Sequence, residues 1–200
     1  MRLHALVADP TKTLPILEAL RDDPSEYVRR SVANHLNDIA KDHPDLVANI
    51  ARDWMTHASK DREKLVRHAC RSLIKQGHSA TLAVFGVLPP AIGTPHIEIN
   101  PRKIVMGEVL TFDVTLGSTS TKPQKLIIDY VIHHRKANGT LAPKVFKWKQ
   151  LTLSPNETLK VSRRHPIRPI TTRTYYAGDH AVSLQINGQD FGHARFELEM

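Results

Sequence analysis

The sequence contains one cysteine, Cys70, among 200 residues. A single cysteine forms no internal disulfide and no cysteine-based zinc site, and so few thiols are typical of a reducing cytoplasm. No apolar run approaches the roughly 20 residues that span a bilayer, so we expect no membrane association. The opening MRLHALVADP is short and soon interrupted by charge, unlike a signal peptide. These absences predict a cytoplasmic protein.

The motifs of common catalytic and metal sites are also missing. The 12 histidines form neither an HExxH motif nor a ladder with cysteines, and the adjacent His133 and His134 point to opposite faces of a predicted strand. There is no GxSxG sequence and no glycine-rich phosphate loop. Cys70 falls on the apolar stripe of its predicted helix, which favours an inert core thiol over a nucleophile. We therefore expect no metal and no cofactor.

Acidic residues are too few to balance the basic ones. The formal net charge is +8 and the pI is about 9.7. Residues 1–90 hold 13 Lys and Arg against 11 Asp and Glu, a net of +2, whereas residues 91–200 hold 15 against 9, a net of +6. Such an excess suits a polyanionic partner such as nucleic acid. A soluble basic protein without that role is the alternative.

Apolar residues recur at helical spacing up to about residue 86. In residues 25–41, Val28, Val32, Leu36 and Ile39 are spaced by four, four and three. The pattern predicts helices over residues 13–21, 25–41, 45–57 and 60–76, with a last helical turn or two at 80–87. Gly77 is the predicted end of the fourth.

These helices contain an internal repeat. YVRRSVANHLNDIAK aligns with LVRHACRSLIKQGHS, with Val28 over Val66, at a period of 38 residues. Helix pairs with this period predict a HEAT-like solenoid, in which each unit buries its apolar face on its neighbours. The first helix matches the second member of a pair, so we expect a truncated solenoid. Its uncapped N-terminal helix would expose apolar surface and favour self-association.

After a linker rich in proline and glycine at residues 89–95, the apolar period changes to two. Short segments of strand character are separated by turn signals such as Asn187-Gly188. The predicted strands are residues 96–99, 109–116, 126–134, 145–153, 158–164, 180–186 and 193–198. The predicted fold is α + β with two domains: HEAT-like helical repeats at 1–88 and an immunoglobulin-like β-sandwich at 96–200.

Asp38 is the one acidic residue whose position calls for a reason. It lies in the last turn of the predicted helix 25–41, where the helix dipole disfavours a carboxylate. A helical wheel places Tyr27, Ser31, Asn34 and Asp38 along one flank, and Arg30, Asn37 and Lys41 on the exposed face. The carboxylate could point into a groove between helices. Alternatively, it is solvated and bonded to Asn34 or paired with Lys41.

Basic residues recur in patterns that suit contact with DNA. Arg29 and Arg30 return one repeat later as Arg67 and His68. In the second half, lysines alternate with apolar residues in a predicted strand, which we interpret as one lysine face able to follow phosphates. The alternative is a solvated outer face. The candidate DNA-binding residues are Arg29, Arg30, Asn34, Arg67, His68, Lys144, Lys147, Lys149, Arg163 and Arg164.

The stretch SEYVRRSVANHLNDIAKDHPDLV, preceded by DPTKTLPILEALRDD, closely resembles the bacterial AlkC-type DNA alkylation repair proteins, relatives of AlkD. The resemblance is dense over residues 3–76, and the β-rich part is similar to the immunoglobulin-like domain that some members carry. It implies a nucleoid-associated glycosylase that binds double-stranded DNA and hydrolyses the N-glycosidic bond of cationic bases such as 3-methyladenine, without flipping the base into a deep pocket.

By motif, the resemblance assigns the catalytic aspartate of the family to Asp38. A carboxylate there would stabilise the oxocarbenium character of the sugar or position a water molecule. The family's tryptophan and second carboxylate have no counterpart in this sequence, so the catalytic activity of this chain is left open. The alternative is a non-catalytic module that binds DNA or another protein.

Overall fold

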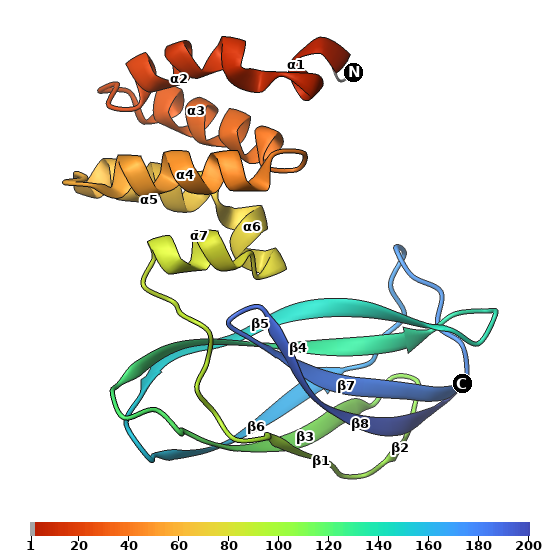
Figure 1. Cartoon of the computed structure of the whole chain (residues 1–200). Coiled ribbons are helices and arrows are strands. Elements are labelled where there is room, and N and C mark those ends of the chain that lie inside the picture. The colour runs from red at the N-terminus through yellow and green to blue at the C-terminus, as the bar shows by residue number, and fades with distance from the viewer. Residues whose placement is uncertain (1–2) are drawn as a thin grey trace. The chain divides into compact units, whose positions relative to one another are not determined.

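The computed structural model describes residues 3–200, which divide into two compact units with the boundary between Gly86 and Val87 (Figure 1). The first unit is helical and the second consists of β-strands. Each has a hydrophobic core of its own.

The helical unit is a succession of short helices that follow one another in chain order (Figure 1). They are α1 (His4–Ala8), the 3-10 helix η1 (Pro10–Thr13), α2 (Leu14–Leu20), α3 (Glu26–Ile39), α4 (Pro44–Met55), α5 (Lys60–Ala69), α6 (Arg71–Gln76) and α7 (Ser79–Val84). Helix α3 buries Val32, Leu36 and Ile39, as its spacing predicts. Gly77 ends α6 in the left-handed conformation, also as predicted.

The single helix predicted over residues 60–76 is wrong, because the chain leaves helical geometry at Cys70 (φ −86°, ψ 3°). In a continuous helix the N–H of Ser72 would donate to the carbonyl of His68, and the break separates these two groups. The N–H of Ser72 donates to Oδ1 of Asn37 instead (3.3 Å), and the carbonyl of His68 accepts from Nη1 of Arg71 (2.7 Å). Asn37, predicted to be exposed, is therefore only 4% exposed.

The second unit contains a three-stranded sheet, β1-β3-β6, and a five-stranded sheet, β2-β8-β7-β4-β5. The strands are β1 (His96–Ile99), β2 (Lys103–Val105), β3 (Val109–Gly117), β4 (Gln124–Arg135), β5 (Leu141–Leu153), β6 (Thr158–Pro166), β7 (Gly178–Ile186) and β8 (Gln189–Glu199). Seven correspond to predicted strands. The prediction missed β2, whose three residues are too few to show an alternating pattern, and which pairs in parallel with β8.

The core of this unit draws on both sheets. Phe112 of β3 packs against Tyr130 of β4 and Trp148 of β5, with ring centroids 5.5 and 5.7 Å apart. The predicted hairpin between β7 and β8 turns at Asn187 and Gly188, both at positive φ (47° and 81°). The Asn187 amide also bonds to the backbone of Leu88, Lys125 and Ile127. The turn thereby ties the start of the unit to β4.

Candidate nucleic-acid interface

Three polar side chains meet where α3 faces α5 and α6. Oδ1 of Asn34 lies 3.0 Å from Nε2 of His68 and 3.2 Å from Nη2 of Arg71. Because this amide oxygen only accepts, Nε2 of His68 carries the proton. Burial, followed by the charges of Arg71 and Arg30, lowers the pKa of His68. The two arginine charges beside this histidine make the local potential positive, which favours anions.

Arg71 belongs to this cluster although sequence reasoning did not select it. It follows Arg67 by four residues, a spacing that would have grouped them on one helix face. The break at Cys70 changes its direction, and its guanidinium bridges the His68 carbonyl and the Asn34 amide. The four-residue spacing from Arg67 could therefore have selected Arg71. It could not have predicted the contacts of Arg71 with His68 and Asn34, because these depend on the helix break at Cys70.

Asp38 lies one turn after Asn34 on the same flank of α3. Its side chain is 70% exposed, and Oδ1 lies 2.6 Å from Nζ of Lys41. This pairing is the arrangement that the alternative interpretation predicts. The predicted flank of Tyr27, Ser31, Asn34 and Asp38 is exposed to solvent at all four positions. An exposed ion pair of this kind contributes about 0–1 kcal/mol, so Lys41 restrains the carboxylate only weakly.

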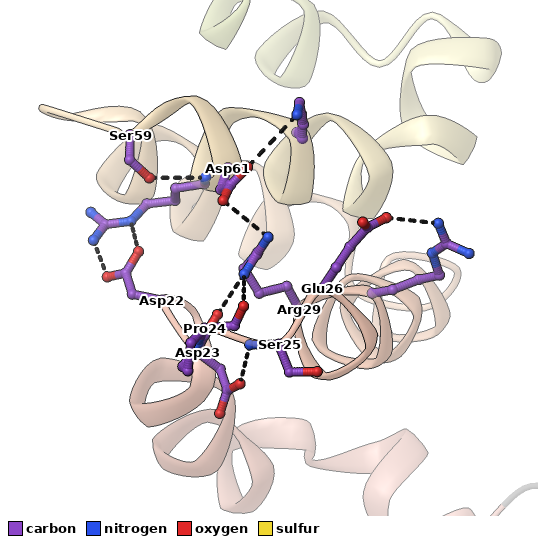
Figure 2. A network of polar contacts seen from close by, with 11 residues as sticks. Asp22, Asp23, Pro24, Ser25, Glu26, Arg29, Ser59 and Asp61 are labelled. Atoms are coloured by element: carbon purple, nitrogen blue, oxygen red, sulfur yellow. Dashed lines mark hydrogen bonds and ion pairs between the residues drawn. The ribbon is translucent and has the colours of Figure 1, made fainter.

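Arg29 is held inside a polar network that joins the turn before α3 to the start of α5 (Figure 2). Its Nη1 donates to the carbonyls of Asp23 (2.7 Å) and Pro24 (2.9 Å), and its Nη2 lies 3.0 Å from Oδ2 of Asp61. Beside it, Arg62 pairs with Asp22. The Arg29 side chain is 14% exposed, so these contacts give it a structural role.

The other basic candidates of the helical unit are more accessible. Arg30 is 64% exposed and pairs with Glu26 at 2.9 Å, within its own helix. The guanidinium of Arg67 lies 4.7 Å from the ring centroid of Phe85, and the residue is exposed. A cavity of about 350 Å³ opens between α3 and α5. Its lining includes Arg30, Lys64 and His68, together with the carboxylates of Glu26 and Asp61.

In the β unit, the predicted lysine face is wrong. Lys144 pairs with Ile132, whose side chain belongs to the core. Lys147 pairs with Asp129, three residues before Ile132 and therefore on the opposite face of β4. Paired residues share a face, so Lys144 and Lys147 lie on opposite faces. Side chains three residues apart in a strand lie on opposite faces. A bulge between Ile128 and Asp129 also shifts the pairing by one residue before Lys149, so simple alternation does not hold there.

The two arginines of β6 differ in the same way. Arg163 pairs with Phe112 of the core, and its guanidinium lies 5.2 Å from the ring centroid of Tyr130. Arg164 is exposed to solvent. Only the second is therefore freely accessible at the surface.

Other chemistry finds little support in residues 3–200. Burial raises the pKa of Cys70 to about 12, as expected for an inert core thiol. Across these residues no group of three or more His, Cys, Asp and Glu side chains could hold a metal ion. None of the described helices is long and apolar enough to cross a membrane.

Comparison with known proteins gives three findings. Residues 94–200 match the family described as uncharacterised protein YhaZ, C-terminal Ig-like domain. The chain is 41% identical over 189 residues to the uncharacterized protein YhaZ of Bacillus subtilis (strain 168), covering 94% of this chain and 52% of that protein. It is also similar, at 40% identity and a TM-score of 0.90, to the solved structure of Pseudomonas fluorescens alkylpurine DNA glycosylase AlkC bound to DNA containing an abasic site analog.

The AlkC similarity covers 100% of this chain and 56% of that one. The chain thus spans about half the length of the relatives that it matches.

Proposed function

We propose that this chain, which belongs to the AlkC-type family of DNA alkylation repair proteins, binds double-stranded DNA and takes part in the excision of cationic alkylated bases such as 3-methyladenine. The observation that carries the proposal is the 40% identity and TM-score of 0.90, over the whole chain, to an alkylpurine DNA glycosylase bound to DNA. This chain corresponds to about half of that protein. Both DNA binding and base excision by this chain are therefore proposals.

The helical unit is proposed to be a HEAT-like array whose α3–α5 side faces the duplex. Three observations support this orientation. The Asn34, His68 and Arg71 cluster lies there, Arg30 and Arg67 are exposed, and burial, followed by the charges of Arg71 and Arg30, lowers the pKa of His68. Phosphates are bound by exposed cations and amides of this kind. Arg29 supports the surface from within and makes no direct contact in this proposal.

In the β unit, exposed Lys144, Lys147, Lys149 and Arg164 are the proposed phosphate contacts. They cannot act as one face, because Lys144 and Lys147 point to opposite sides of β5. We therefore assign them at most separate contacts, and Arg163 none, because its guanidinium covers Tyr130.

Asp38 is the proposed catalytic carboxylate. Breaking the N-glycosidic bond leaves positive charge on the deoxyribose, and a nearby carboxylate stabilises that charge or positions the attacking water. A cationic base is already a good leaving group, so no strong general acid is required. The exposed position of Asp38 leaves it accessible to a duplex, and the pair with Lys41 is weak enough to be exchanged for the developing cation.

The same ion pair supports a second candidate, a non-catalytic module that binds DNA or a protein. In that case Lys41 and Asp38 form an ordinary surface pair that stabilises the end of α3. The two candidates predict different effects of Asp38→Asn. Catalysis predicts lost release of 3-methyladenine from methylated duplex DNA, with duplex affinity preserved or increased. The binding module predicts no release by either form and no change in affinity.

The experiment measures base release by chromatography and duplex affinity by fluorescence anisotropy on the same preparations. Asp53→Asn, which removes an exposed carboxylate from the last turn of α4, is the matched control. Release by the unchanged chain that survives in Asp38→Asn would exclude Asp38 as the catalytic residue. An absence of duplex binding by the unchanged chain would refute the wider proposal.

A further inference from the structure

A second cavity, of about 480 Å³, lies wholly in the β unit, around the end of β4 and the segment before β7. Three cationic residues line it, Arg135, Lys136 and Arg173, and its lining contains no acidic residue. Within residues 3–200, none of these three cations forms an ion pair with a carboxylate. The cavity is therefore a concentration of uncompensated positive charge, which favours an anion.

His134 forms part of the lining and is 4% exposed. Neither of its ring nitrogens has a hydrogen-bond partner among the described residues. The ring packs edge-on against Tyr175 and His180, with centroids 5.4 and 5.8 Å away, so aromatic contacts fix its direction without satisfying its nitrogens. Buried polar groups without a partner are costly and uncommon, so this histidine points to a ligand that supplies one.

The protonation state of His134 restricts which anion fits. Burial, followed by the charge of Arg173, lowers the pKa of His134 to about 3. At neutral pH the imidazole is uncharged, with one nitrogen that donates and one that accepts. A fitting anion needs an acceptor oxygen for the first and an O–H donor for the second. Inorganic phosphate near pH 7 carries both, whereas sulfate and phosphate diesters have no O–H group.

We propose that this cavity binds free inorganic phosphate. The charges of Arg135, Lys136 and Arg173 attract the anion, and a ring nitrogen of His134 accepts a hydrogen bond from its hydroxyl group. The site is independent of the proposed DNA interface, because the diester linkages of a DNA backbone lack the hydroxyl group. A phosphate monoester carries that group only in its singly charged form and binds less tightly at neutral pH.

The test titrates the complete chain with inorganic phosphate at pH 7 and constant ionic strength, followed by calorimetry and by the ring resonances of His134. We expect saturable binding and a shift of those resonances. Sulfate and dimethyl phosphate should bind at least about tenfold more weakly, since each lacks one charge-assisted or donor contact. A 5′-mononucleotide distinguishes an esterified source of phosphate from the free anion.

Two substitutions locate the site. Arg173→Gln and His134→Phe should each weaken phosphate binding by about tenfold or more, whereas Lys160→Gln, at an exposed cation of β6 away from the cavity, should leave it unchanged. Should His134→Phe fail to fold, Arg173→Gln alone decides. Equal binding of sulfate and phosphate, no saturable binding, or unchanged binding by Arg173→Gln would each overturn the proposal. Loss of DNA binding or base release would not bear on it.

Discussion

Oδ1 of Asn37 in α3 accepts a hydrogen bond from the backbone N–H of Ser72 in α6, across 35 residues of sequence. That N–H is left without an intrahelical partner by the break at Cys70, so one buried amide completes the backbone of another helix. The break in turn directs Arg71 toward Asn34. A residue that sequence analysis placed in solvent therefore supports the cluster on which the proposed DNA interface depends.

Asn37→Ala should lower the free energy of unfolding of the helical unit by about 1–3 kcal/mol, because it removes the acceptor of the partly buried Ser72 N–H. Urea denaturation followed by helical circular dichroism measures this loss. Asn49→Ala, at an exposed amide of α4, is the matched control and should change it by less than about 0.5 kcal/mol. Equal effects of the two substitutions would show that the contact contributes nothing specific.

Arg29→Ala should destabilise the helical unit by about 1–3 kcal/mol, because it removes three hydrogen bonds from a mostly buried guanidinium. Arg30→Ala removes only an exposed pair with Glu26 and should cost less than about 0.5 kcal/mol. The same denaturation experiment compares them. A larger loss in Arg30→Ala would contradict the structural role that we assign to Arg29.

Arg71→Gln should weaken binding to duplex DNA of any sequence and reduce the slope of log K against log salt by about 1, as expected for the loss of one phosphate contact. Anisotropy titrations between about 50 and 200 mM salt measure both quantities. Lys12→Gln, at an exposed lysine of η1 that the proposal leaves unused, is the control. An unchanged slope in Arg71→Gln would remove this cluster from the interface.

Lys41→Gln should preserve or increase base release if Asp38 is catalytic, because it removes the competing cation and leaves the carboxylate in place. Stability should fall by no more than about 1 kcal/mol, the contribution of an exposed pair. Release assays and thermal denaturation measure the two effects. If release falls as far as in Asp38→Asn, the intact pair, and not the free carboxylate, is what the reaction requires.

The stability of the β unit should fall as the pH is lowered from about 6.5 to about 4. Burial first, then neighbouring arginine charge, lowers the pKa of His134 to about 3 and that of His165 to about 4, from an ordinary 6.5. In this window the unfolded chain takes up protons that the folded chain does not, at about 1.4 kcal/mol per pH unit for each histidine.

Urea denaturation in phosphate-free buffer, followed by Trp148 fluorescence in Trp54→Phe protein, measures this slope. His134→Phe should remove the contribution of one proton from this slope. A stability of the β unit that does not vary across this range would contradict the predicted shifts.

The features that sequence analysis predicted correctly depend on local pattern. The stripe of Val32, Leu36 and Ile39 and the turn at Asn187-Gly188 follow from helical spacing and from residues that tolerate positive φ. The features that it missed depend on distant partners. Nothing near Cys70 in the sequence signals a helix break. The acceptor that satisfies the N–H of Ser72 after the break is Asn37, which belongs to another helix.

The same distinction applies to the candidate site. Basic spacing selected Arg29 and Arg30 together, but the turn at Asp23 and Pro24 captures the first and leaves the second in solvent. Arg71 was missed because its position depends on the break. The strand lysines were misplaced for a simpler reason, since a three-residue separation already reverses the face in an extended chain.

The burial of Cys70 also gives the protein an internal reporter. It is the only thiol in the chain and has no surface exposure, so a maleimide can reach it only when the junction between α5 and α6 opens. The rate of labelling therefore measures how often this part of the helical unit separates. A duplex that covers the adjoining surface would slow the labelling of Cys70. The labelling rate would then report DNA binding at this surface, with no label on the DNA.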